Sequence, residues 1–259
     1  MCVLFLAIDQ HPRWRVVLAS NRDEQYERST RPADRWEDCP RVIAGRDEEA
    51  GGTWLGVRED LAWTVVTNVR DLPAHREGAR SRGDLPRQFL CGGGSPSRYI
   101  RDMHGAREAF NPFNLLVARG DEVWYGSTHT EAPERLTAGI YGLSNATLDV
   151  PWPKVRRGKA ALAELLGTPD LSPAPLFSLL DDAEPAPDPD LPETGVGLDW
   201  ERVLSPIFIA SERYGTRAQS VLLLDREGGG LFVERTTTPG LPASERAFTL
   251  GSRLPGATP

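Results

Sequence analysis

The strongest constraint on the fold is a pair of apolar runs at the start of the chain. Residues 3–8 are continuously apolar, residues 9–12 are turn-like, and residues 15–20 form a second run. Such runs are typical of strands covered on both faces, and the turn between them predicts an antiparallel hairpin. In that hairpin positions 2 and 21 lie nearly opposite each other, on strands about 4.8 Å apart. The chain should therefore return the polar segment 21–24 to the sheet edge that holds Cys2.

The order of the remaining elements predicts an α+β fold with antiparallel sheets. Further strands are predicted at residues 54–58, 61–67, 113–118, 122–126, 139–143, 220–225, 231–236 and 247–250. Helices are predicted at residues 85–91, 96–104, 153–166, 175–182 and 200–204. Strands cluster at both ends of the chain, without the strict strand–helix alternation of a parallel fold. The length suits one large domain over residues 1–259.

The charge of the chain argues against nucleic-acid binding. The net charge of −7 does not favour binding to a phosphate backbone, so no nucleic-acid partner is expected. Positive charge is nearly all arginine, since Lys154 and Lys159 are the two lysines. This bias indicates a G+C-rich bacterial genome or, alternatively, anion recognition.

The first apolar run, the cysteines and the histidines together predict a cytoplasmic protein without a cofactor. Residues 3–8 are too short for a membrane span and lack the basic region of a signal peptide. The three cysteines are scattered, which suits a reducing compartment better than a disulfide framework. The four histidines are isolated, so no metal site is expected. Oligomeric state cannot be read from this sequence.

Cys2 is the residue that points most directly to chemistry. It follows the initiator methionine and is small enough for Met1 removal to be expected. Removal would place a thiol and a free α-amine on one residue. An amine with a pKa of about 7.7–8.0 can accept the proton of a neighbouring thiol without a histidine. The alternative interpretation is structural, because a lone cysteine at the start of an apolar strand commonly packs as a small buried apolar residue.

Two neighbours of Cys2 fit a nucleophilic site. Asp23 can accept a hydrogen bond from the α-amine, and the Arg22 cation can lower the pKa of the thiol. The structural alternative is an ion pair between Arg22 and Asp23 at a strand end, which would stabilise the fold little.

Three residues further along the chain complete a possible site. Asn68 and Asn145 each follow a predicted strand, where an amide can donate to a developing oxyanion. Either asparagine taken alone also fits an Asx turn. Arg217 stands before the predicted strand at 220–225 and can neutralise a thiolate or a substrate carboxylate, or be a solvated turn cation.

An ordered series of short motifs resembles the NRDE family, which includes the eukaryotic transport-and-Golgi-organisation proteins. The series covers nearly the whole chain: Met1-Cys2, residues 21–24 (NRDE), 51–56 (GGTWLG), 67–68 (TN), 113–116 (FNLL), 142–145 (GLSN), 204–208 (LSPIF) and 214–217 (YGTR). The opening is similar to the N-terminal-nucleophile hydrolases of the penicillin V acylase and bile salt hydrolase type. This resemblance implies a four-layer αββα sandwich with two antiparallel sheets inside.

The resemblance also implies roles for individual residues. Cys2 would be the nucleophile, Arg22 and Asp23 its polar neighbours, and Arg217 a supporting cation. Asn68 and Asn145 would lie near the oxyanion.

The resemblance leaves two functions open. The first is a cysteine amidohydrolase that acts on a small nonpeptide amide after removal of Met1. The second is a non-catalytic protein that binds or traffics haem or a lipid, because members of the family have been linked to those ligands. Cys39-Pro40 matches a Cys-Pro haem motif, which would fit the second function, although such a dipeptide is usually incidental in a loop.

Overall fold

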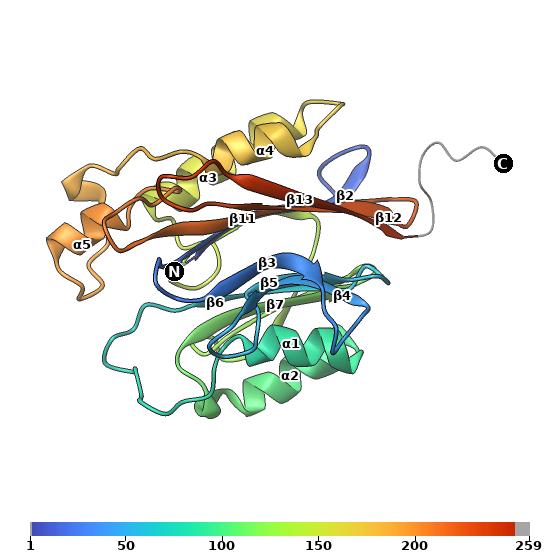
Figure 1. The fold of residues 1–259 in the computed structure, drawn as a ribbon, viewed down its shortest axis with the longest axis horizontal. Helices are drawn as coiled ribbons and strands as arrows, with labels where there is room; N and C mark the ends of the chain where they lie inside the picture. Colours follow the sequence, from blue (N-terminus) through green and yellow to red (C-terminus); the bar gives the residue numbers. More distant parts are fainter. Residues whose placement is uncertain (1, 252–259) are drawn as a thin grey trace.

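Two antiparallel sheets form the centre of the computed structural model, which describes residues 2–251 (Figure 1). The six-stranded sheet contains, in spatial order, β10 (Gly139–Leu143), β1 (Cys2–Ile8), β2 (Trp14–Gln25), β11 (Tyr214–Asp225), β12 (Gly229–Thr236) and β13 (Ser244–Gly251). The seven-stranded sheet contains β3 (Thr30–Arg35), β4 (Val42–Asp47), β5 (Leu55–Arg58), β6 (Trp63–Asn68), β7 (Phe113–Arg119), β8 (Glu122–Ser127) and β9 (Glu134–Leu136).

Helices cover the outer face of each sheet and complete four layers. The helices α1 (Asp84–Gly92) and α2 (Pro96–Gly105) pack on the seven-stranded sheet, and α3 (Pro153–Leu166) and α4 (Pro173–Leu180) pack on the six-stranded sheet (Figure 1). A shorter helix, α5 (Leu198–Val203), precedes β11. This arrangement is the αββα sandwich that the resemblance implied. Within residues 2–251 no helix has the length and apolarity needed to cross a membrane.

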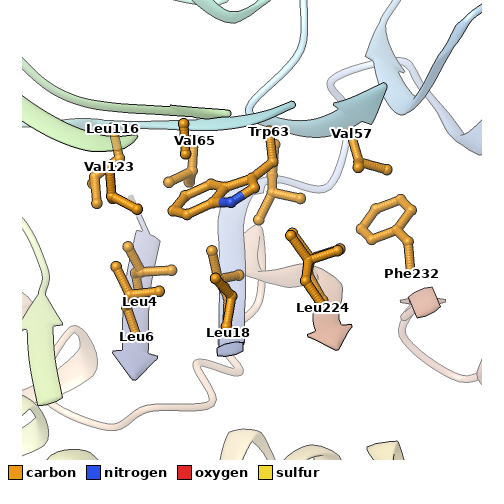
Figure 2. Packing of buried hydrophobic residues seen from close by; sticks show 14 of the residues in the cluster. Leu4, Leu6, Leu18, Val57, Trp63, Val65, Leu116, Val123, Leu224 and Phe232 are labelled. Carbon is orange, nitrogen blue, oxygen red and sulfur yellow. The ribbon is translucent and has the colours of Figure 1, made fainter. Parts of the chain in front are cut away.

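The apolar runs at the start of the chain are covered on both faces, as predicted. Leu4 and Leu18 face the seven-stranded sheet and meet Trp63 in the core between the sheets (Figure 2). Their neighbours Val3 and Phe5 belong to a second buried cluster, under α3 and α4. Because successive side chains of a strand point to opposite faces, each strand of the hairpin contributes to both cores.

The hairpin register differs by one residue from the prediction. Cys2 lies opposite Arg22, and Val3 lies opposite Asn21. A shift of one residue exchanges the two faces of a strand. Arg22 therefore shares the inter-sheet face with Cys2, whereas Asn21 and Asp23 belong to the face covered by helices.

Three strands were missed because their sequences lack a strand pattern. β3 and β9 are edge strands, and β3 contains Pro32 and exposed charged residues, which edge strands tolerate. β4 changes from buried apolar to charged residues within its length. Strands β2 and β11 also continue further than predicted, through polar residues at the end of the sheet where Cys2 lies.

Helix α3 lies unusually close to β1. A Cβ atom added to Gly158 would lie 2.0 Å from Cζ of Phe5, so the helix can approach this far only with glycine at that position. The approach fixes the first turn of α3, which carries Lys154, over the end of the sheet where β1 begins.

Candidate functional site

Cys2 is the first residue of β1 and lines a cavity of about 430 Å³. Its side chain is 8% exposed and faces the inter-sheet side of the strand. The cavity wall also includes Arg22, Asn68, Trp54 and Arg82. The sheets therefore place Cys2 in the wall of a polar cavity that is large enough for a small molecule. Met1, whose removal was expected, lies outside the described residues.

The buried position of Cys2 determines its resting protonation state. Burial raises the pKa of the thiol above its usual range, and the Arg22 guanidinium offsets part of that rise. The resting group is therefore a thiol and needs a nearby base before it can attack a carbonyl carbon.

Arg22 is held rigidly beside Cys2. Its side chain is 5% exposed, and Nη2 lies 3.2 Å from Oδ2 of Asp47. Its guanidinium also lies 4.4 Å from the ring centroid of Trp54. The stacked cation is close enough to lower the pKa of the Cys2 thiol.

Asp23 lies on the opposite face of β2 and is almost completely buried. Thr216 donates a hydrogen bond from Oγ1 to Oδ1 of Asp23 at 2.7 Å, and the Tyr214 hydroxyl donates to its backbone oxygen at 3.0 Å. Burial raises the pKa of the Asp23 carboxyl, whereas the positive charge of Lys154 and the hydrogen bond from Thr216 lower it. The carboxylate is therefore fixed in place beside the start of β1.

Asn68 and Asn145 contact each other. Asn68 ends β6 and lines the cavity, and Asn145 donates from Nδ2 to Oδ1 of Asn68 at 2.9 Å and to its backbone oxygen at 3.1 Å. Asn145 is not among the cavity-lining residues of the described chain. Because the Asn68 amide oxygen accepts from Asn145, the Asn68 Nδ2 group is the donor that this pair can offer a ligand.

Arg217 supports the turn after β2 and is not part of the described cavity wall. It occupies a β-bulge in β11, opposite Arg22 and Asp23. Its Nη1 group donates to the backbone oxygen of Gln25 at 3.2 Å and to that of Arg28. Arg217 thus braces the backbone that carries the polar end of β2.

Sequence reasoning missed Lys154. Its side chain is 2% exposed, and Nζ donates to the backbone oxygen of Leu204 at 2.8 Å. Burial lowers the pKa of Lys154 to about 8, even though the nearby charge of Asp23 opposes that shift. A nearby pair, Arg70 and Glu201, lies 2.7 Å apart, and both side chains are buried. A lysine in the first turn of a helix is an ordinary surface pattern, and the one available signal was that lysine is rare in this chain.

Arg82 was missed for a similar reason. It belongs to the irregular segment between β6 and α1, where an arginine is usually solvated. The structure brings this arginine to the wall of the cavity that contains Cys2.

The structure separates the other cysteines from this site. Cys39 and Pro40 line a different cavity, together with Cys91. Within residues 2–251 no cluster of three or more His, Cys, Asp or Glu side chains is arranged to hold a metal ion.

These features define a class of fold: an αββα sandwich with a cysteine at the first position of a central strand. A solved structure with a similar fold, the Caenorhabditis elegans N-acylethanolamine-hydrolyzing acid amidase ortholog, matches 86% of this chain and 92% of its own, with a TM-score of 0.50. The sequence identity is 10%, so the likeness establishes the fold alone.

The chain belongs to the family described as Transport and Golgi organisation 2, whose model matches residues 1–239. The Bos taurus Transport and Golgi organization protein 2 homolog is 33% identical, over 98% of this chain and 99% of its own length. The Homo sapiens homolog is also 33% identical, over 91% and 93%. The Drosophila melanogaster protein is 28% identical, over 92% and 93%. All three relatives come from animals, so the bacterial origin and the cytoplasmic location suggested by the sequence stay predictions.

Proposed function

We propose that this protein is a cysteine N-terminal-nucleophile amidohydrolase acting on a small nonpeptide amide after removal of Met1. The observation that carries the proposal is the position of Cys2. Its thiol faces a polar cavity, while its backbone nitrogen starts the strand beside the buried carboxylate of Asp23. A nucleophile and an amine base would then belong to one residue, with a separate group to orient each.

The first chemical step is attack by the Cys2 sulfur on the amide carbonyl carbon. The thiol proton passes to the α-amine of the same residue, because burial keeps the resting sulfur protonated. Asp23 accepts a hydrogen bond from that amine and stabilises the ammonium that forms. Arg22 stabilises the negative charge on sulfur before the new bond is complete.

The carbonyl oxygen becomes an oxyanion in this step. Asn68 donates to it from Nδ2, and Asn145 fixes the orientation of Asn68 through the two hydrogen bonds described above. Loss of one such donor typically costs about 2.7–4 kcal/mol of transition-state stabilisation.

Collapse of the tetrahedral intermediate breaks the C–N bond. The ammonium of Cys2 returns its proton to the leaving amine, and the acyl group stays on sulfur as a thioester. A water molecule then gives a proton to the α-amine and attacks the thioester, which releases the carboxylic acid and restores the thiol. The amidase of similar fold hydrolyses N-acylethanolamines, which supports an amide as the substrate class.

A protein that binds haem or a lipid without chemistry is the second candidate inferred from the sequence. The cavity beside Cys2 is lined mostly by charged and polar residues, which favours a small polar ligand over an apolar macrocycle. Titration with haemin tests this candidate, since saturable Soret absorbance at one haem per chain would support it.

The experiment that tests the amidohydrolase has two stages. The intact mass of purified protein, before and after alkylation under native conditions, should show the loss of Met1 and modification at Cys2. Hydrolysis of a panel of N-acyl amides should then persist in Cys91→Ala, whose thiol lies outside the cavity, and disappear in Cys2→Ala. Turnover by folded Cys2→Ala at the wild-type rate, or retention of Met1 on active protein, would exclude the mechanism.

A further inference from the structure

One cation in the cavity wall lacks a partner of opposite charge. Arg82 is partly buried and donates from Nη1 to the backbone oxygen of Pro112 at 3.1 Å. Within residues 2–251 it forms no ion pair with a carboxylate. A partly buried charge without a counter-ion is less favourable than a paired one, which makes this arginine an exception within the cavity wall.

The other arginines of the cavity wall are paired. Arg22 and Arg28 share Asp47, at 3.2 and 2.6 Å, and Arg28 also contacts Glu49 at 2.9 Å. Arg80 lies 3.4 Å from Asp84.

The acidic residues near the cavity therefore already contact other groups. Glu24 lies 3.6 Å from Arg22 and 3.9 Å from Arg28. Asp23 also contributes to the cavity wall, but its Oδ1 accepts from Thr216 and it forms no ion pair with Arg82 among the described residues. An anion for Arg82 would thus come from outside the described chain.

Arg82 is also close enough to Cys2 for their charges to interact. Burial lowers the pKa of Arg82, and the charge of Glu24 and the ionised form of Cys2 oppose that shift in part. A guanidinium stays protonated even so, and its planar fork matches the oxygens of a carboxylate or a phosphate. A ligand that occupies this cavity can therefore reach the nucleophile and the arginine together.

We propose that the substrate is an anionic amide whose carboxylate or phosphate group pairs with Arg82 while its carbonyl lies against Cys2. The statement about the carbonyl rests on the proposed amidohydrolase function, whereas the pairing with Arg82 concerns binding alone. The cavity of about 430 Å³ limits this ligand to a small molecule.

The test compares three probes of the same length: N-hexanoylglycine, the neutral N-hexanoylglycinamide, and N-hexanoylaminomethylphosphonate. Their affinities are measured by calorimetry on Cys2→Ala, so that hydrolysis is not required. At least one of the two acids should bind about 10-fold or more tightly than the neutral amide, which corresponds to one charge-assisted contact. The better acid identifies the anionic group, and its advantage should fall as salt concentration rises.

Three variants in the Cys2→Ala background assign the preference to one side chain. Arg82→Gln should bind the acid and the neutral amide equally, and Arg82→Lys should retain part of the preference. Arg80→Gln is the matched control, because Arg80 lines the same wall but is paired with Asp84 and 52% exposed, so it should keep most of the preference. Thermal unfolding confirms that each variant is folded.

Two results would overturn the proposal. One is the lack of any preference for either acid, including no measurable binding of any probe. The other is an equal loss of acid and neutral binding in folded Arg82→Gln, which would assign Arg82 to the loop structure. Because these measurements need no turnover, a failed hydrolysis assay would leave the charge preference intact, and a failed preference would leave hydrolysis intact.

Discussion

The two faces of the six-stranded sheet differ in what they place around Cys2. On the inter-sheet face, Arg22 is buried but its partners Asp47 and Glu24 are 14% and 30% exposed, at the wall of an open cavity. On the helix face, Asp23 is 1% exposed, and Lys154 of α3 is 2% exposed. The inter-sheet face opens onto the cavity, whereas the side chains of the helix face are almost completely buried, although Asp23 also contributes to the cavity wall.

This difference shows how an antiparallel hairpin can surround the thiol and the backbone nitrogen of Cys2 with different neighbours. Consecutive residues of β2 point to opposite faces, so Arg22 and Asp23 approach Cys2 from different sides. In the proposed mechanism Arg22 acts on the thiol, and Asp23 acts on the backbone nitrogen. Arg22 and Asp23 are adjacent in the sequence but lie in separate environments in the structure.

The largest effect is expected from removing the charge on the helix face. Asp23→Asn should keep a hydrogen bond from Thr216 but lose the negative charge beside the amine, and kcat should fall about 100-fold or more. Asp47→Asn, which alters the cavity face instead, should lower kcat about 10-fold or less, because Arg22 retains Glu24 nearby. Steady-state kinetics on the amide found in the substrate screen compares the two, and equal losses would contradict the division between faces.

A smaller effect is expected from Lys154→Met, which removes the buried cation of the helix face. The charge of Lys154 lowers the pKa of Asp23, so its loss raises that pKa and moves the acid limb of the pH–rate profile to higher pH. At a pH between the old and new limbs, kcat/KM should fall about 10-fold. Lys154→Arg should restore the original limb.

The shape of this profile distinguishes the electrostatic role from a structural one. If Lys154 only supports packing through its hydrogen bond to Leu204, then Lys154→Met lowers the temperature of unfolding and leaves the acid limb in place.

The smallest effect on activity, and a measurable one on stability, is expected at Glu234. This carboxyl is buried between the sheets, and Ala33 donates its backbone N–H to Oε1 at 2.6 Å. Burial raises the pKa of Glu234 from 4.5 to about 7. Because the folded pKa is raised, the stability that the protonated carboxyl contributes is fully present below about pH 4.5. It is lost as the pH rises through about 7.

Glu234→Gln should remove this pH dependence. From about pH 5 to about pH 8 the wild type should lose on the order of 2 kcal/mol of unfolding free energy relative to the variant. Urea denaturation at the two pH values measures the change. Parallel losses in both proteins would show that Glu234 does not titrate in this range.

The sequence was sufficient to predict the hairpin, the antiparallel α+β class and the segment that meets Cys2. Apolar runs and turns are local signals, and the resemblance to N-terminal-nucleophile hydrolases supplied the four layers. The exact faces could not be predicted, because a shift of one residue in register exchanges them and nothing in residues 9–12 determines the register alone.

The residues that sequence reasoning missed depend on distant packing. Lys154 lies near Asp23 because α3 docks on β1, and Arg82 enters the cavity wall through a loop that has no periodic pattern. The sequence predicted Asn145 near an oxyanion and Arg217 as a supporting cation, and in the structure Asn145 contacts Asn68 and Arg217 contacts the turn after β2.

The close contact between Gly158 and Phe5 matters for the interpretation of natural variants. In a sequence comparison, Gly158→Ala would be classed as a mild change that favours the helix. In this fold the added methyl group would push α3 away from β1 and carry Lys154 away from Asp23. A variant at this position should therefore be grouped with those of the site, although its own side chain would never touch a ligand.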